Sequence, residues 1–292
     1  MTGGRPVRQV WVDGVEEGER RLTRSTVGMV ATGTVAGIDI MIGALAQMTM
    51  LGAMTEVLPP LPAKMIAAFM LGIAFMFITV GRSELFTENF LIPVAPVLAG
   101  RERWTRVAKL WAITGVMNLV AMIVLTLLFV IPGVLDPQTL AAVGEVADKY
   151  AGRSIPASIA SAIIAGAVIT VFTWGLAAAE TASVRLVMAL LLGFVLAAPT
   201  LNHAIVGFGE SFWGVMAGTA VEATHAKVLL NLGIAIVFNT VGGMLFVTLT
   251  RLYQVIGEEE DGGSLTEIVD NTQAANAAEA DTQTAGSPER RT

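Results

Sequence analysis

The stretch GRSELFTENF, residues 81–90, places one arginine, two glutamates and several uncharged polar residues inside an apolar region. The apolar run MIAAFMLGIAFMFITV precedes it, and LIPVAPVLAG follows it. In hydrocarbon, backbone that leaves a helix must be buried in protein or line a cavity, because its polar groups find no water. The stretch therefore predicts a break in a membrane-spanning segment.

The composition of the whole chain also indicates an integral membrane protein. The 292 residues are 54% hydrophobic and only 14% charged, with a mean hydropathy of +0.69. These values are too apolar for an ordinary soluble domain. An apolar block of about 20 residues crosses a bilayer core of roughly 30 Å. We expect six such spans, at residues 26–52, 65–99, 110–131, 155–179, 186–208 and 228–250.

The predicted spans divide the chain into three parts. Residues 26–252 are expected to form a six-helix transmembrane domain. Residues 1–25 are polar with apolar residues at helical spacing, which suggests either an interfacial helix on the membrane or a poorly ordered leader. Residues 253–292 are acidic and nearly free of large apolar residues, so we expect a disordered tail.

The basic residues predict the orientation. With the N-terminus inside, eleven Lys and Arg flank the spans on the inner side and four on the outer side. Short loops rich in Lys and Arg stay in the cytoplasm, so both termini are expected to be cytoplasmic, in the inner (plasma) membrane.

A second interruption, LAAPTLNHAIVGFG, occupies residues 196–209 of the fifth span. Pro199 removes a backbone donor there, and Asn202 and His203 follow it. Each break lies in the middle span of a three-span half. This pattern predicts an all-α, aquaporin-like fold of two three-helix inverted repeats, with a site where the breaks meet. His203 is a candidate for that site, because ionisable residues inside a membrane are usually functional.

Four stretches together resemble the formate/nitrite transporter family. GRSELFTENFLIPVAP is similar to the loop that interrupts the family's second helix, and LNHAIVG (201–207) to its histidine-bearing fifth-helix motif. AGIDIMIG (36–43) and NTVGGMLFV (239–247) resemble its first and sixth helices. The resemblance covers residues of about 20–252. It implies a homopentamer in the lipid bilayer, with one pore per protomer for small monovalent anions of weak acids.

The resemblance also implies roles for individual residues. Leu85, Phe86 and Thr87 would form the loop that opens or closes the cytoplasmic side. His203 would be the central pore histidine, with Thr87 as its partner. Apolar constrictions would lie at Phe75 and Leu196, and the sixth-helix asparagine would be Asn239.

Some positions depart from the family pattern and leave the substrate open. Asn202 stands where many members carry an acid. Arg82 and Asp39 are also unusual, so formate or nitrite itself is not assumed. We expect Arg82 to bind the anion or to pair with Glu84 and hold the broken helix, and Asp39 to pair with Arg82.

The expected mechanism follows from desolvation. An anion pays a large penalty at an apolar constriction, whereas its neutral acid pays far less. His203 would therefore polarise or protonate the anion, with Thr87 fixing the imidazole. The alternative is that the anion gains its proton in the vestibule, which leaves His203 as a polar neighbour.

Other function classes fit the sequence less well. The chain has no cysteine, two histidines, and neither an H-E-x-x-H nor a G-x-S-x-G motif, so an enzyme, a metal site or a cofactor is not expected. A water or glycerol channel would show paired N-P-A turns, and the sequence has none. Nucleic-acid binding would need a basic surface domain, which the sequence also does not predict. The remaining alternative is a transport-inactive membrane scaffold or sensor of the same fold.

Overall fold

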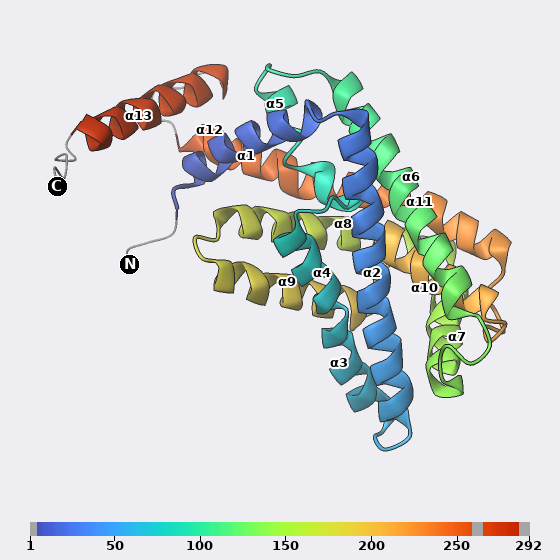
Figure 1. The fold of residues 1–292 in the computed structure, drawn as a ribbon. Helices are drawn as coiled ribbons and strands as arrows, with labels where there is room; N and C mark the ends of the chain where they lie inside the picture. The colour runs from blue at the N-terminus through green and yellow to red at the C-terminus, as the bar shows by residue number, and fades with distance from the viewer. Residues whose placement is uncertain (1–4, 259–264, 286–292) are drawn as a thin grey trace, which may run out of the picture.

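The structure, a computed structural model, describes residues 5–258 and 265–285, and these ranges form helices and turns without a strand (Figure 1). The elements up to the middle of the chain are α1 (Val7–Leu22), α2 (Thr26–Thr55), α3 (Pro60–Met70), α4 (Gly72–Gly81), η1 (Phe86–Phe90), α5 (Ala95–Leu98) and α6 (Trp104–Phe129). Those that follow are α7 (Pro137–Ala151), α8 (Ile155–Ala178), α9 (Ala182–Ala197), α10 (Ala204–Met216), α11 (His225–Gly243), η2 (Met244–Thr248), α12 (Leu249–Gly257) and α13 (Leu265–Ala285).

Most of the predicted spans appear as long apolar helices. Five helical segments of the described chain are long and apolar enough to cross a membrane: Thr26–Thr55, Pro60–Gly81, Trp104–Phe129, Ile155–Ala178 and His225–Gly257. The predicted fifth span is divided between α9 and α10, which have 16 and 13 residues. Each is shorter than the roughly 20 residues that one crossing needs. The count of six crossings therefore stays a prediction.

The first break follows α4. Arg82 adopts a left-handed backbone conformation (φ +53°), which is uncommon for residues other than glycine. The chain is then extended at Leu85, before η1. The expected second half-helix up to residue 99 appears as a short apolar helical segment over Phe86–Leu98. It is not one continuous α-helix, because the 3₁₀ helix η1, a series of turns and the four-residue α5 make it up. Pro93 contributes to this, because it lacks the N–H that would continue a helix from η1, whereas Pro96 lies in the first turn of α5, where that N–H is not needed.

The second break lies where the sequence predicts it. α9 ends at Ala197, and the next residues leave the helix, with Thr200 in the left-handed region at φ +56°. α10 then begins at Ala204, and His203 is its N-cap residue.

Asn118 of α6 holds the first break in place. Its side-chain oxygen accepts a hydrogen bond from the backbone N–H of Phe86 at 2.9 Å. Its amide nitrogen donates to the carbonyl of Gly33 in α2 at 2.7 Å and to that of Glu84 at 3.2 Å. One side chain thus satisfies three backbone groups that the break leaves without helical partners.

Asn239 of α11 makes the same three bonds in the second half. It accepts from the N–H of Ala204 at 2.8 Å and donates to the carbonyls of Ala162 in α8 at 2.8 Å and Asn202 at 3.0 Å. In each half, an asparagine on the last long helix hydrogen-bonds both to the break and to the first long helix of that half. This repeated pattern supports the predicted internal repeat.

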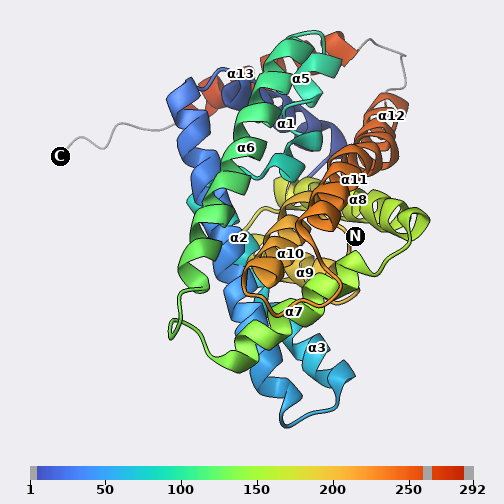
Figure 2. The same ribbon diagram turned by 90° about the vertical axis from the view of Figure 1, so that its right-hand side faces the viewer.

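The terminal helix α1 lies across one end of the bundle, beside α5 and α12 (Figures 1 and 2). It buries Trp11, Val12 and Val15 against protein. The predicted helix within residues 1–25 is therefore present. Its placement on a membrane surface stays a prediction.

The predicted disorder of residues 253–292 differs from the structure over much of its length. α12 continues the last long helix to Gly257, and α13 docks beside α1. Ile268 and Val269 of α13 are buried, and Arg8 of α1 donates to the carbonyl of Ile268 at 3.1 Å. The alanine-rich sequence favours a helix, and packing of the Ile–Val pair stabilises it. Residues 259–264 and 286–292 lie outside the described residues.

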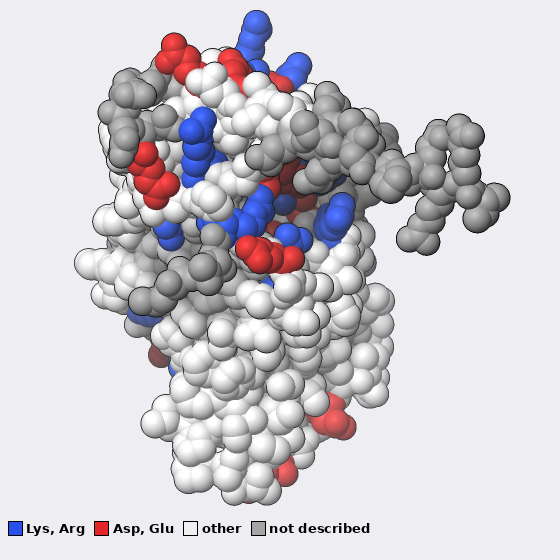
Figure 3. Space-filling view, turned by 90° about the vertical axis from the view of Figure 1, so that its left-hand side faces the viewer, with Lys and Arg blue, Asp and Glu red and all other residues white. Residues whose placement is uncertain are grey.

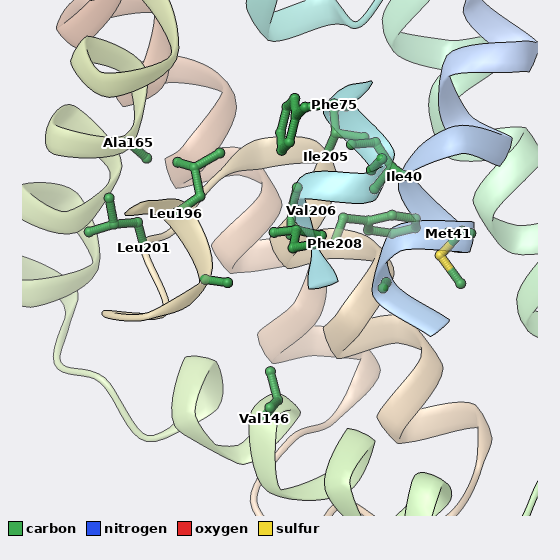
Figure 4. Packing of buried hydrophobic residues seen from close by; sticks show 14 of the residues in the cluster. Ile40, Met41, Phe75, Val146, Ala165, Leu196, Leu201, Ile205, Val206 and Phe208 are labelled. Atoms are coloured by element: carbon green, nitrogen blue, oxygen red, sulfur yellow. The ribbon is translucent and has the colours of Figure 1, made fainter. Parts of the chain in front are cut away.

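The charged and apolar side chains are separated. On the face in Figure 3, charged side chains gather in the upper half around a hollow, and the lower half is almost uncharged. The main core cluster lies between the helices of both halves and includes Phe75, Leu196, Leu201 and Val206 (Figure 4).

Candidate functional site

His203 is completely buried at the start of α10. Its Nδ1 accepts a hydrogen bond from the backbone N–H of Val206 at 3.2 Å. A neutral imidazole that accepts at Nδ1 carries its proton on Nε2. Within residues 5–258 and 265–285, Nε2 has no hydrogen-bond partner. The side chain therefore has one N–H donor available for a small polar guest.

Thr87 is also completely buried, in η1 of the first break. Its hydroxyl has no hydrogen-bond partner among the described residues. Because η1 contacts α10, the two breaks meet as the sequence predicted. The expected hydrogen bond between Thr87 and His203 is not made among the described residues, since the Thr87 hydroxyl and His203 Nε2 both lack a partner while Nδ1 caps α10.

The other two residues of the predicted loop have different surroundings. Leu85 is completely buried in the main core. The ring of Phe86 packs edge-on against Phe90 and Trp111, with centroids 5.3 and 6.1 Å apart. Phe86 also lines an apolar groove between α6 and α11. The side chain of Phe86 thus faces α6.

Asn202 and Asn239 both hold the second break. The backbone N–H of Asn202 donates to the hydroxyl of Ser161 at 2.9 Å, and its amide reaches the carbonyl of Ser158 at 3.4 Å. The three bonds of Asn239 use its side-chain oxygen and amide nitrogen. These contacts make both asparagines supports of the backbone that carries His203.

Phe75 of α4 and Leu196 of α9 lie in the core that both halves share (Figure 4). Their exposed fractions are 1% and 2%. The burial fits apolar constrictions and ordinary core packing equally, so the predicted constriction role remains a proposal.

The structure corrects both predicted pairings of Arg82. Glu84 forms ion pairs with Arg24 at 2.7 Å and with Arg21 at 3.7 Å. Asp39 accepts a hydrogen bond from the hydroxyl of Ser83 at 2.7 Å. The chain turns at Arg82 in a left-handed conformation, and Arg82 does not pair with Glu84. Arg21 in the last turn of α1 and Arg24 just after it supply the cations that pair with Glu84.

A cavity of about 330 Å³ lies between α1, the first break and the end of α8. Six arginines and four carboxylates line it: Arg5, Arg20, Arg21, Arg24, Arg82, Arg185, Asp13, Glu17, Glu84 and Glu88. Burial raises the pKa of Glu17, but the guanidinium groups of Arg20 and Arg21 outweigh this and lower that pKa. Arg82 forms no ion pair with any described residue, so the lining holds an available cation.

Sequence reasoning missed three contributors. Asn118 could have been found as the one side-chain amide in the third predicted span. It occupies a place in that span like the place of Asn239 in the sixth. Arg21 and Arg24 are among the basic residues that predict the orientation, and in the structure they also pair with Glu84. Among the described residues, no group of three or more His, Asp or Glu side chains is placed to hold a metal ion.

Comparisons with known proteins identify the family of this chain. The model of the family described as "Formate/nitrite transporter" matches residues 8–253. Inner membrane protein YfdC of Escherichia coli (strain K12) is 25% identical over 209 residues, or 70% of this chain. That alignment covers 65% of the relative, so this chain spans slightly less than two thirds of its length.

Two solved structures share the fold. The "FNT family ion channel" has a TM-score of 0.72 and 18% identity, covering 84% of this chain and 98% of the other. The "Pentameric formate channel with formate bound" has a TM-score of 0.65 and 16% identity, covering 80% and 98%. At these identities the likeness shows the fold, and the family match covers most of the chain. The chain belongs to the formate/nitrite transporter family of membrane proteins.

Proposed function

We propose that this protein is a transmembrane pore for small monovalent anions of weak acids. The observation that carries the proposal is the pair of unpartnered polar atoms, His203 Nε2 and Thr87 Oγ1, buried where the two breaks meet. A buried polar group without a hydrogen bond costs free energy. An anion of a few atoms accepts hydrogen bonds from both groups and removes that cost.

Desolvation sets the proposed mechanism. An anion at the level of Phe75 and Leu196 would lose its hydration in an apolar environment, which disfavours the charged form strongly. The Nε2–H of His203 donates a hydrogen bond to the anion. Full transfer of that proton first requires His203 to take up a second proton at Nδ1 in place of its bond with Val206, so that a neutral imidazole is left when the neutral acid crosses the constriction. The competing route, protonation in the vestibule, makes flux independent of His203.

The arginine-lined cavity supports a role as the vestibule. Its six arginines outnumber its four carboxylates, so its field attracts anions. Arg82 lies beside the first break and has a free guanidinium fork, which suits a carboxylate or similar oxyanion. We place this end and both termini in the cytoplasm, as the distribution of basic residues predicts.

We further propose a homopentamer in the plasma membrane. One structural neighbour is a pentameric channel, and the curated relative is named as an inner membrane protein. The apolar groove between α6 and α11, with Trp111, Val116, Leu232 and Ile236 among its lining residues, offers a surface for a second copy. Native mass spectrometry tests this, since five chains of 30.6 kDa give a distinct mass.

The function is tested by flux into proteoliposomes. The purified protein is reconstituted and presented with formate, nitrite, acetate, lactate and hydrosulfide in turn, with protein-free liposomes as the control. We expect at least one anion to enter far faster than in the control. No flux of any of them, in protein shown to be folded, would favour the scaffold or sensor alternative.

A further inference from the structure

A second buried ionisable group lies on the same helix face as His203. Glu210 of α10 is seven residues further along, which is about 10.5 Å and nearly two full turns. Its exposed fraction is 2%. The proposed mechanism above does not use this carboxyl group.

Glu210 has only one polar partner. The hydroxyl of Tyr150, at the end of α7, lies 2.9 Å from its Oε2. Its Oε1 is buried and has no partner within residues 5–258 and 265–285. Glu84, in contrast, is buried beside two arginines. A buried carboxylate without a paired cation is costly, so this environment favours the uncharged acid.

Tyr150 connects Glu210 to the break that carries His203. Its hydroxyl lies 3.4 Å from the carbonyl of Leu201, which also accepts the backbone N–H of His203 at 2.8 Å. A tyrosine hydroxyl donates one proton at a time. When Glu210 is ionised, Tyr150 donates to it. When Glu210 is protonated, its own O–H donates to the tyrosine oxygen, and the tyrosine O–H can donate to the carbonyl of Leu201.

Charged groups near this pair come from several elements. Lys64 of α3 attracts Glu210 electrostatically without forming an ion pair with it. Arg153, after α7, lies 5.3 Å from the ring of Tyr150 and donates to the carbonyl of Pro199. His225 of α11 contacts the ring of Phe212, two residues beyond Glu210.

The remaining neighbours of α10 carry their charges elsewhere. In the described chain, the charged residue of α2 is Asp39, which binds Ser83 at the first break. Those of α6 are Arg106 and Lys109, in its first two turns. Glu145 and Lys149 of α7 pair with each other at 2.6 Å, and Asp148 of α7 accepts from backbone N–H groups of the α10–α11 loop. Lys227 of α11 pairs with Glu222 at 3.4 Å, and Glu88 of η1 lines the cavity at the first break. Lys64 and Arg153 are thus the cations that act on the Glu210–Tyr150 pair, and neither forms an ion pair with Glu210.

We propose that Glu210 exchanges a proton with the transported anion on the external side of His203. This inference rests on the proposed pore and its orientation. The O–H bond of the Glu210 acid breaks as an O–H bond forms on the anion, giving the neutral acid and a carboxylate. Tyr150 then donates to that carboxylate, and a proton from the external water restores the acid. In this way Glu210 supplies the proton, and the Nε2–H of His203 holds the transported group by a hydrogen bond.

The first test measures formate uptake into proteoliposomes against external pH. We compare the wild type with Glu210→Gln, Tyr150→Phe and the control Glu145→Gln, an exposed carboxyl near the same end. Glu210→Gln should lower the pH-dependent uptake by roughly tenfold or more, as removal of a general acid does. Tyr150→Phe should shift the pH profile, and Glu145→Gln should leave it unchanged. A Glu210→Gln profile that matches the wild type overturns the inference.

A second readout does not depend on transport. The infrared difference spectrum of the wild type minus Glu210→Gln should contain, near neutral pH, the C=O band of a protonated carboxyl group. If the wild type moves no anion, the proposed function fails, while the band still decides whether Glu210 holds a proton. Absence of the band overturns the inference. If Glu210→Gln does not fold, Glu210→Asp takes its place, with a shifted band and pH profile expected.

Discussion

Replacement of Asn239 by alanine should destabilise the protein more than its size suggests. The substitution removes three hydrogen bonds, of 2.8, 2.8 and 3.0 Å, and leaves three backbone groups at the second break without partners. Hydrogen bonds within membrane proteins contribute about 0.6 kcal/mol on average and up to about 1.7 kcal/mol. Three of them predict a loss of about 2–5 kcal/mol.

Asn118→Ala provides an internal comparison. It removes the same three kinds of bond at the first break, so its cost should fall in the same range. The matched control is Asn231→Ala, on the same helix as Asn239. Asn231 is only half-buried and makes weaker bonds, with Ser158 at 3.1 Å and Tyr150 at 3.3 Å. Its loss should cost less than about 1.5 kcal/mol.

The assay is the free energy of unfolding of each variant in the same bilayer or detergent, with the oligomeric state checked beforehand. The account requires Asn118→Ala and Asn239→Ala to be similar and both to exceed Asn231→Ala. If Asn239→Ala costs no more than the control, the asparagines do not hold the breaks and the reasoning is refuted.

Three further predictions concern packing and charge. Gly166→Ala should lower the melting temperature, because its added Cβ would clash with the carbonyl oxygen of Asn239 and prevent close contact of α8 with α11. The control is Gly233→Ala, whose Cβ meets nothing within 4 Å, and equal melting temperatures of the two variants would contradict the predicted clash. Arg24→Ala should destabilise the first break by less than the roughly 3–5 kcal/mol of a fully orphaned charge, since Arg21 remains near Glu84, and added Glu84→Gln should restore part of the loss in a denaturation assay. Burial raises the pKa of Asp148, but N–H donors of the α10–α11 loop outweigh burial and lower that pKa. Asp148→Asn should therefore cost stability at neutral pH and progressively less as the pH falls below about 4. A deficit that persists in acid would show that the ionised Asp148 does not hold this loop.

The breaks themselves were predictable from the sequence because polarity and proline inside apolar spans have few structural solutions. GRSELFTENF and the segment around His203 could be located by hydropathy alone. The form of the first break was not predictable in the same way. Pro93 is compatible with the start of a helix, but the turns around it depend on contacts from α6 and η2.

Pairings between distant segments were less accessible. Nothing local to Glu84 indicates that its cation is Arg24, sixty residues earlier, rather than Arg82, two residues away. The choice is made by the left-handed turn at Arg82 and by the position of α1. Likewise, the docking of α13 through Ile268 and Val269 depends on the surface that α1 offers, which local composition does not encode.

His203 is proposed to act on an anion in transit. The decisive measurement compares the pH-dependent uptake of the best-transported anion by the wild type and His203→Ala in proteoliposomes of equal protein content. We expect uptake to collapse in His203→Ala while the folded oligomer persists. Uptake that stays at the wild-type rate, with the same pH dependence, would contradict it and leave protonation in the vestibule as the mechanism.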